Sequence, residues 1–183
     1  MKRTLLIMLI GLLFVTVEAQ DKNSKKRLSR EEKKELKRQQ EEKAVKIVSA
    51  IIDDKRFILE ADYIRNRYGQ SLPVNSNINF VAVDSTRAIF QFGSAHTVGI
   101  NGVGGVTIEG RITSFDVQKR EKSGSYYIHI NISATTGFYE IQLDVTSTGM
   151  ASAQVTALSR HRIEYSGRLA PLNQSRVFKG TSY

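Results

Sequence analysis

Residues 125–145, SYYIHINISATTGFYEIQLDV, decide the fold of this protein. Apolar and polar side chains alternate through both halves of the stretch, and a short turn ending in Gly137 separates the halves. Alternation with a period of two is typical of a half-buried strand, and a tight Gly-containing turn joins antiparallel strands. The stretch therefore predicts a hairpin with one face in the core. The residues expected to point inward are Tyr126, Ile128, Ile130, Ile132, Tyr139, Ile141, Leu143 and Val145.

The same alternation recurs on both sides of this hairpin. RFILEADYI, residues 56–64, predicts a half-buried strand with Phe57, Leu59, Ala61 and Tyr63 on one face. INFVAVD and RAIFQF predict a second hairpin whose turn spans residues 84–86. RYGQSLPVNSN, residues 67–77, has the composition of a loop. Further strands are predicted in RITSFDVQKR (111–120), MASAQVTAL (150–158) and RIEYSGRLA (162–170).

Short strands at regular spacing suggest a barrel or a sandwich. The inward residues expected in MASAQVTAL are small (Ala151, Ala153 and Ala157, with Val155), which leaves room for a neighbouring element. We therefore predict an α+β, mainly β fold: one N-terminal helix packed on a curved antiparallel meander of about seven or eight strands, a common sheet size. The sequence leaves open whether this sheet is a small closed barrel or a half-barrel.

The basic charge of the chain is local. The formal net charge is +9, and most of the excess lies between residues 21 and 56, where Lys and Arg are interleaved with Glu. Ser29 followed by Glu32 forms a capping-box pattern at the start of a helix. Apolar residues at three- and four-residue spacing from Ala44 to Ile52 predict a stripe that packs on the domain.

These features divide the mature chain into a charged helical arm, residues 20–43, and one β-rich domain, residues 44–183. The arm is interpreted as a solvated helix, with a weak coiled coil or a partner-binding arm as the main alternative. Contact with anionic lipid is less favoured because the charged half lacks an inserting apolar face. Nucleic acid is not expected as a partner, because the interleaved glutamates would repel phosphates.

Residues 1–19 have the parts of a cleavable export signal: Lys2 and Arg3, a short apolar run, and Ala19 before a polar residue. We expect cleavage after Ala19 and a periplasmic or secreted protein. The apolar run is too short for a spanning helix, so no transmembrane segment is expected in the mature chain. The chain has no cysteine. It is therefore predicted not to be a lipoprotein and to form no disulfide.

The glycine-rich stretch GINGVGGVTIEG, residues 99–110, resembles a nucleotide loop only superficially. The segment that follows it is strand-like, whereas a phosphate-binding loop leads into a helix. We interpret the glycines as a structural corner. A weaker hypothesis makes them a lip over a barrel mouth. The weak candidate positions for a ligand are Gly102, Gly104 and Gly105 in the lip, with inward Tyr126, Tyr139 and Tyr165 as its lining.

Four segments, FVAVDSTRAIFQFGS, NGVGGVTIEGRI, GFYEIQLDV and RIEYSGRLAPLNQSRVFKG, resemble an uncharacterised family of small exported Bacteroidetes proteins, a domain of unknown function. The resemblance covers roughly residues 45–180, and NGVGGVT and YSGRL are its most specific motifs. It implies a β-rich domain and a periplasmic or secreted location. It implies no catalytic residue. Some members resemble lipoproteins, but this chain lacks the cysteine.

The sequence offers no catalytic constellation. His96, His129 and His161 are scattered, so neither a metal nor another cofactor is expected. No nucleophile motif is found, and no enzyme is predicted. We expect an interaction or structural module of the cell envelope that binds an unknown envelope protein. The alternative is a module that binds a small apolar ligand in a barrel-like cavity.

Overall fold

The computed structural model describes residues 29–66, 68–94, 99–157 and 162–182. The expected signal peptide, with its cleavage after Ala19, lies outside the described residues, as do His96 and His161. The contacts within the chain divide it into two units, with the boundary between Lys37 and Arg38. Among the residues described, no helix combines the length and the apolar character needed to cross a membrane.

Helix α1, Arg30–Asp53, begins with the predicted capping box. The Ser29 backbone N–H donates to Glu32 Oε2 at 2.7 Å, and the Glu32 N–H donates to Ser29 Oγ at 3.1 Å. Two of the backbone donors at the start of the helix are thereby satisfied. The helix ends where Lys55 adopts a left-handed φ of 53°. This residue turns the chain directly into the first strand.

The apolar stripe of α1 is only partly buried. Val48, Ile51 and Ile52 join the main core, whereas Val45 and Ile47 are 42% and 48% exposed. At 100° per residue, these two exposed positions flank the arc centred on Val48. The expectation that the whole stripe from Ala44 to Ile52 packs on the domain was therefore wrong at its margins.

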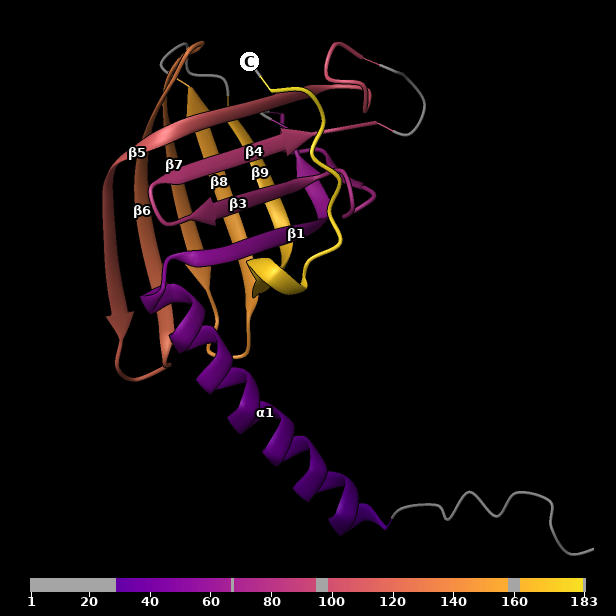
Figure 1. The fold of residues 1–183 in the computed structure, drawn as a ribbon. Helices are drawn as coiled ribbons and strands as arrows, with labels where there is room; N and C mark the ends of the chain where they lie inside the picture. Colours follow the sequence, from indigo (N-terminus) through magenta and orange to yellow (C-terminus); the bar gives the residue numbers. More distant parts are fainter. Residues whose placement is uncertain (1–28, 67, 95–98, 158–161, 183) are drawn as a thin grey trace, which may run out of the picture. The chain divides into compact units, whose positions relative to one another are not determined.

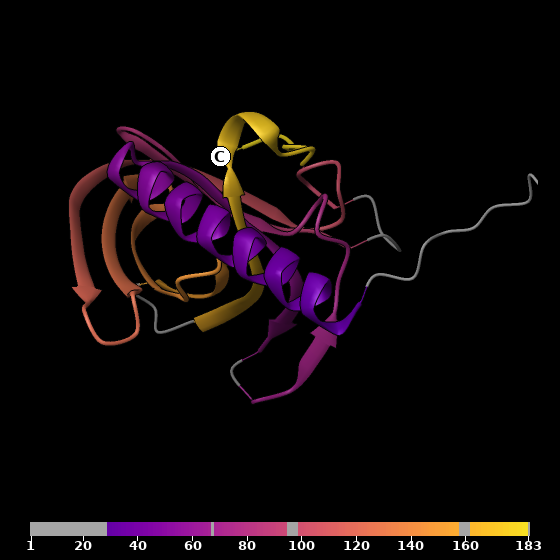
Figure 2. The same ribbon diagram turned by 90° about the horizontal axis from the view of Figure 1, so that it is seen from below.

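The strands form a closed antiparallel barrel (Figures 1 and 2). Eight strands pair in sequence around the ring, and pairing between the first and the last closes it, which settles the question of closure. A ninth, β2 (Ser71–Pro73), pairs with β1 inside the segment predicted as a loop. The barrel strands are β1 (Arg56–Arg65), β3 (Phe80–Asp84), β4 (Arg87–Phe92), β5 (Val106–Arg120), β6 (Ser125–Ala134), β7 (Gly137–Val145), β8 (Met150–Ala157) and β9 (Arg162–Pro171).

Inward side chains fill the barrel interior as the alternation predicts. The central hairpin buries Ile128, Ile130 and Ile141 completely. In β8, Ala153 lies directly opposite Tyr165 of β9, so a small residue accommodates a large one. Tyr165 is fully buried, and its hydroxyl has no hydrogen-bond partner among the described residues.

A β-bulge changes the phase of β1. The pairing with β9 shifts register between Ala61 and Tyr63, and after such a bulge the residues exchange faces. Tyr63 was predicted to point inward, but it is 52% exposed and Ile64 is buried in its place. The prediction assumed strict alternation along the strand, and alternation alone does not reveal the extra residue that the bulge inserts.

The outer face of β1, β3 and β4 is covered by the C-terminal segment, which follows the short 3-10 helix η1 (Leu172–Gln174). Figure 1 shows this segment crossing the three strands. Leu172 and Val177 pack on a second apolar cluster formed by Ile58, Phe80 and Ala82. The prediction that the first strand is half-buried was therefore wrong, because it is covered on both faces in its first half.

Gln91 anchors this C-terminal segment. Its side chain is completely buried, and its Nε2 donates to the carbonyls of Ile78 and Phe178 at 3.0 and 2.9 Å. Its Oε1 accepts from the Thr107 hydroxyl and the Gly180 N–H, both at 2.8 Å. Every hydrogen-bonding position of the amide is therefore used, as a buried amide requires.

Candidate functional site

One cross-strand row on the outer face of the barrel gathers unusual side chains. Arg87 of β4 lies opposite Arg111 of β5. Arg111 lies opposite Ser133 of β6, and Ser133 opposite Phe138 of β7. Directly opposed residues point to the same face of a sheet, and like charges in that position repel. Two facing arginines therefore require an explanation.

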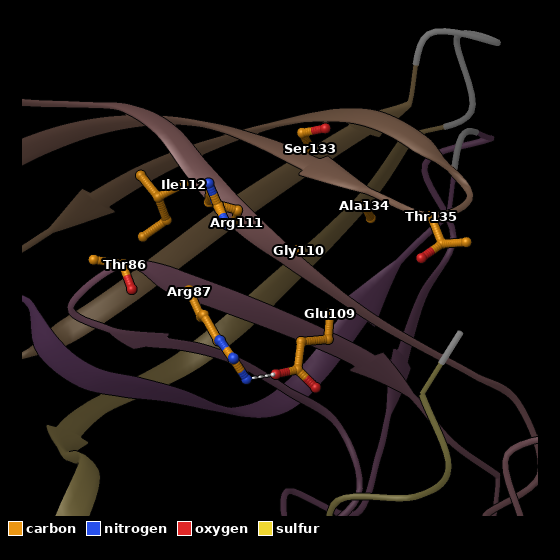
Figure 3. Close-up of a pocket in the computed structure, with 9 residues that line it drawn as sticks. All are labelled: Thr86, Arg87, Glu109, Gly110, Arg111, Ile112, Ser133, Ala134 and Thr135. Carbon is orange, nitrogen blue, oxygen red and sulfur yellow. Dashed lines mark hydrogen bonds and ion pairs between the residues drawn. The ribbon is translucent and has the colours of Figure 1, made fainter.

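The first three members of this row line a surface hollow of about 580 Å³. Gly110 lines the hollow where β5 and β6 approach closely, since an added Cβ would lie 2.8 Å from the Ser133 carbonyl oxygen. Figure 3 shows the side chains of Arg87 and Glu109 reaching toward each other. The lining residues are Thr86, Arg87, Glu109, Gly110, Arg111, Ile112, Ser133, Ala134 and Thr135.

Glu109 is shared by several donors. Its Oε1 lies 3.2 Å from Arg87 Nη1, and its Oε2 pairs with Lys179 of the C-terminal segment. The hydrogen bond from Lys179 is the largest cause of the lowered pKa of Glu109. Burial opposes it, and the nearby Arg87 lowers the pKa further. Glu109 therefore remains ionised below its ordinary pKa, and its charge is already engaged by two cations.

Arg111 has no counter-ion among the residues that the structure describes. Within the described ranges, its guanidinium makes no ion pair or hydrogen bond. Arg87 and Lys179 both pair with the carboxylate of Glu109, and Arg111 lines the same hollow. A hollow with excess positive charge and the hydroxyls of Ser133 and Thr135 has the chemistry that binds an anion.

A second hollow, of about 360 Å³, adjoins the first across the Ser133–Phe138 pair. Its lining mixes polar and apolar side chains, and it carries a carboxylate instead of arginines. Glu140 Oε1 accepts from Gln142 Nε2 at 2.6 Å and lies 2.7 Å from His129 Nε2. The second hollow is lined by Thr113, Asn131, Ile132, Phe138, Tyr139, Glu140, Thr156 and Ala157.

The glycine positions suggested as a lip have a clear backbone role. Gly102 and Gly104 have φ of 77° and 79°, a region that favours glycine. A Cβ on Gly105 would lie 2.0 Å from the Phe92 carbonyl oxygen. Buried Asn101 accepts from the N–H groups of Val103 and Gly105. The stretch is therefore the predicted structural corner, and a ligand role for these glycines stays a prediction.

The three candidate tyrosines point inward but lie at different levels of the barrel. Tyr139 pairs with Ile132, which lies roughly 20 Å along β6 from Tyr126 at the usual rise per strand residue. The Tyr139 hydroxyl contacts Thr136 Oγ1 at 2.9 Å. Burial raises the pKa of the Tyr165 hydroxyl well above its ordinary value. The structure therefore does not bring these three side chains together around one described hollow.

His129 lies on the outer face of β6, as the alternation predicts. Its side chain contacts Glu140. The hydrogen bond from Gln142 is the largest cause of the lowered pKa of Glu140, and the contact with His129 adds to it. In the part of the chain that the structure describes, no cluster of three or more His, Asp or Glu side chains is suited to a metal ion.

The sequence analysis missed the residues of the row. Arg87, Arg111 and Phe138 occupy outward positions of three separate strands, where polar or isolated apolar residues are ordinary. Each was visible as an outward residue by alternation. Only the register between strands shows that they are neighbours.

This fold and surface define a closed, eight-stranded antiparallel barrel protein with an electropositive hollow on its outer face. The chain belongs to the family described as a domain of unknown function, DUF4251, whose model matches residues 37–169. The family resemblance predicted from the motifs is thereby confirmed.

A solved relative has the same fold. The crystal structure of a DUF4251 family protein from Bacteroides eggerthii is 31% identical and superimposes with a TM-score of 0.61. The similarity covers 76% of this chain and 95% of that chain. No curated protein matches the sequence.

Proposed function

We propose that this protein is a non-catalytic binding module of the cell envelope that recognises an anionic group in the hollow around Arg111. The observation that carries the proposal is the Arg87–Arg111 pair, in which two arginines face each other. The nearby carboxylates are already engaged: Glu109 by Arg87 and Lys179, and Asp84, which lies opposite Arg87, by Arg56. A bound carboxylate or phosphate would offset this repulsion and accept two hydrogen bonds from the planar guanidinium.

The envelope location is part of the proposal. It is supported by the features of an export signal in residues 1–19 and by membership of a family with a Bacteroides relative. The mature chain is then expected to begin at Gln20. N-terminal sequencing of the protein purified from its own cells tests this, and an intact residue 1–19 segment would contradict it.

The test of the anion site is the variant Arg111→Gln. Because Arg111 is exposed and makes no described contact that the fold requires, the variant is expected to fold normally. We expect its affinity for inorganic phosphate, measured by NMR titration, to fall about tenfold, the usual loss of a charge-assisted contact.

Arg168→Gln is the matched control, because it removes the same charge from an exposed position on β9. Its phosphate affinity is expected to stay within about twofold of that of the unmodified protein, because only a screened long-range attraction is lost. Equal losses in both variants, or none in Arg111→Gln, would show that the hollow is not an anion site.

A second candidate function, binding of a small ligand inside the barrel, is favoured by one observation: the buried, unpartnered hydroxyl of Tyr165. Such a group costs stability unless an unseen molecule satisfies it. If the interior is dry, Tyr165→Phe should raise the free energy of unfolding by about 1 kcal/mol.

Urea denaturation followed by circular dichroism measures this effect, and Tyr127→Phe on the outer face of β6 is the control. A lower stability of Tyr165→Phe would indicate that the hydroxyl has a bound partner. That result would favour the interior site over a purely external one.

A further inference from the structure

We infer that the two hollows form one elongated site for an acidic saccharide, in which the anion lies against Arg111 and the sugar ring lies on Phe138. This inference rests on the proposed anion site and names the class of ligand. It follows from three features of the outer face: the position of Phe138, the chemistry of the second hollow, and the opposite charges of the two hollows.

Phe138 is an exposed aromatic with a defined neighbour. Its side chain is 59% exposed, and it shares the cross-strand row with Ser133 and Arg111. Arg111 on β5 and Phe138 on β7 are two strand spacings apart, about 10 Å. A ligand that contacts both must therefore carry its anionic group at one end and an apolar ring face further along.

The second row along this face supplies groups that bind hydroxyls. Asn131 lies opposite Glu140, and Glu140 lies opposite Thr156. Both described contacts of Glu140 use Oε1, so in the described part of the chain Oε2 accepts no hydrogen bond. This oxygen can accept from a hydroxyl donor in the second hollow.

The charges of the two hollows determine which end of the ligand lies in which hollow. The hydrogen bonds from Gln142 and His129 keep the pKa of Glu140 low, so its carboxylate is ionised near neutral pH. A second anion beside it would be repelled, whereas a neutral polyhydroxyl ring would not. An anion at Arg111 and a ring with hydroxyls between Phe138 and Glu140 describe a sugar that carries a carboxylate or a phosphate.

The test compares four probes on the mature chain by NMR titration: inorganic phosphate, glucose 6-phosphate, glucuronate and glucose. We expect at least one of the two sugar anions to bind about tenfold more tightly than phosphate, with glucose weakest. Phe138→Ala should abolish this preference and leave phosphate affinity unchanged. Phe178→Ala, which removes another exposed ring, is the matched control and should keep the preference.

Comparing glucuronate with glucose 6-phosphate shows whether the site prefers a carboxylate or a phosphate. Binding of either sugar anion more tightly than inorganic phosphate supports the inference. The inference is overturned if both sugar anions bind no better than phosphate, or if Phe138→Ala keeps the preference. Those outcomes leave the anion site intact as long as Arg111→Gln still weakens phosphate. If Arg111→Gln has no effect on phosphate, the proposed function itself fails.

Discussion

Replacing Gly167 by alanine is expected to lower the free energy of unfolding by at least about 3 kcal/mol, at the upper end of overpacking costs. Gly167 of β9 lies opposite Ala61 of β1, at the seam that closes the barrel. A Cβ there would lie 1.9 Å from the Glu60 carbonyl oxygen and 2.9 Å from the Ala61 Cα. Because both contacts are backbone, relief requires the two strands to separate.

Urea denaturation followed by far-ultraviolet circular dichroism measures the loss. Gly102→Ala is the control: unlike Gly167, Gly102 has a left-handed φ, 77°, but no neighbouring atom lies within 4 Å of the added Cβ. It is expected to cost only the strain of a left-handed residue, about 1 to 2 kcal/mol. A Gly167→Ala protein as stable as this control would show that the seam tolerates a side chain.

Gln91→Leu is expected to release the C-terminal segment from the barrel. The substitution keeps the approximate volume but leaves the Ile78 and Phe178 carbonyls, the Gly180 N–H and the Thr107 hydroxyl without this partner. Each buried polar group left unpaired costs about 1 to 3 kcal/mol. Since the segment can lift and regain water, the net loss of stability is expected to be about 3 kcal/mol.

Limited trypsin digestion with mass spectrometry distinguishes release of the segment from global unfolding. We expect faster cleavage after Arg176 and Lys179 while the barrel strands stay protected. Gln154→Leu, on the outer face of β8, makes the same chemical change outside the network and should leave the digestion pattern unchanged. Unchanged cleavage in Gln91→Leu would contradict the anchoring role.

The meander was predictable because each strand carries its own pattern. In β6, alternate residues from Tyr126 to Ile132 are buried, as the sequence indicates. The capping box at Ser29 was equally local, because both hydrogen bonds join residues three apart. The most specific motifs, NGVGGVT and YSGRL, each contain a glycine that lies against another strand, Gly105 and Gly167. The sequence predicted a structural corner at the first but did not identify the neighbouring strand.

The misses have a common cause, which is that they depend on distant parts of the chain. The bulge in β1 exposes Tyr63 although its local alternation is regular. The C-terminal segment covers Ile58 because Gln91 holds it there, and a glutamine at an outward position gives no sign of burial. In the same way, Arg87, Arg111 and Phe138 lie in one cross-strand row only because of the register in which β4 to β7 pair.

The sequence by itself determined the helix start, the order and facing of most strands, and the inward residues, because these follow from hydrogen bonds and periodicities within short segments. Tertiary structure alone decided that the sheet closes, that β1 is covered on both faces, and that two arginines face each other beside an exposed phenylalanine. Closure, covering and cross-strand pairing each depend on which strands become neighbours. That choice is made by the packing of the whole barrel and is not encoded in any single stretch.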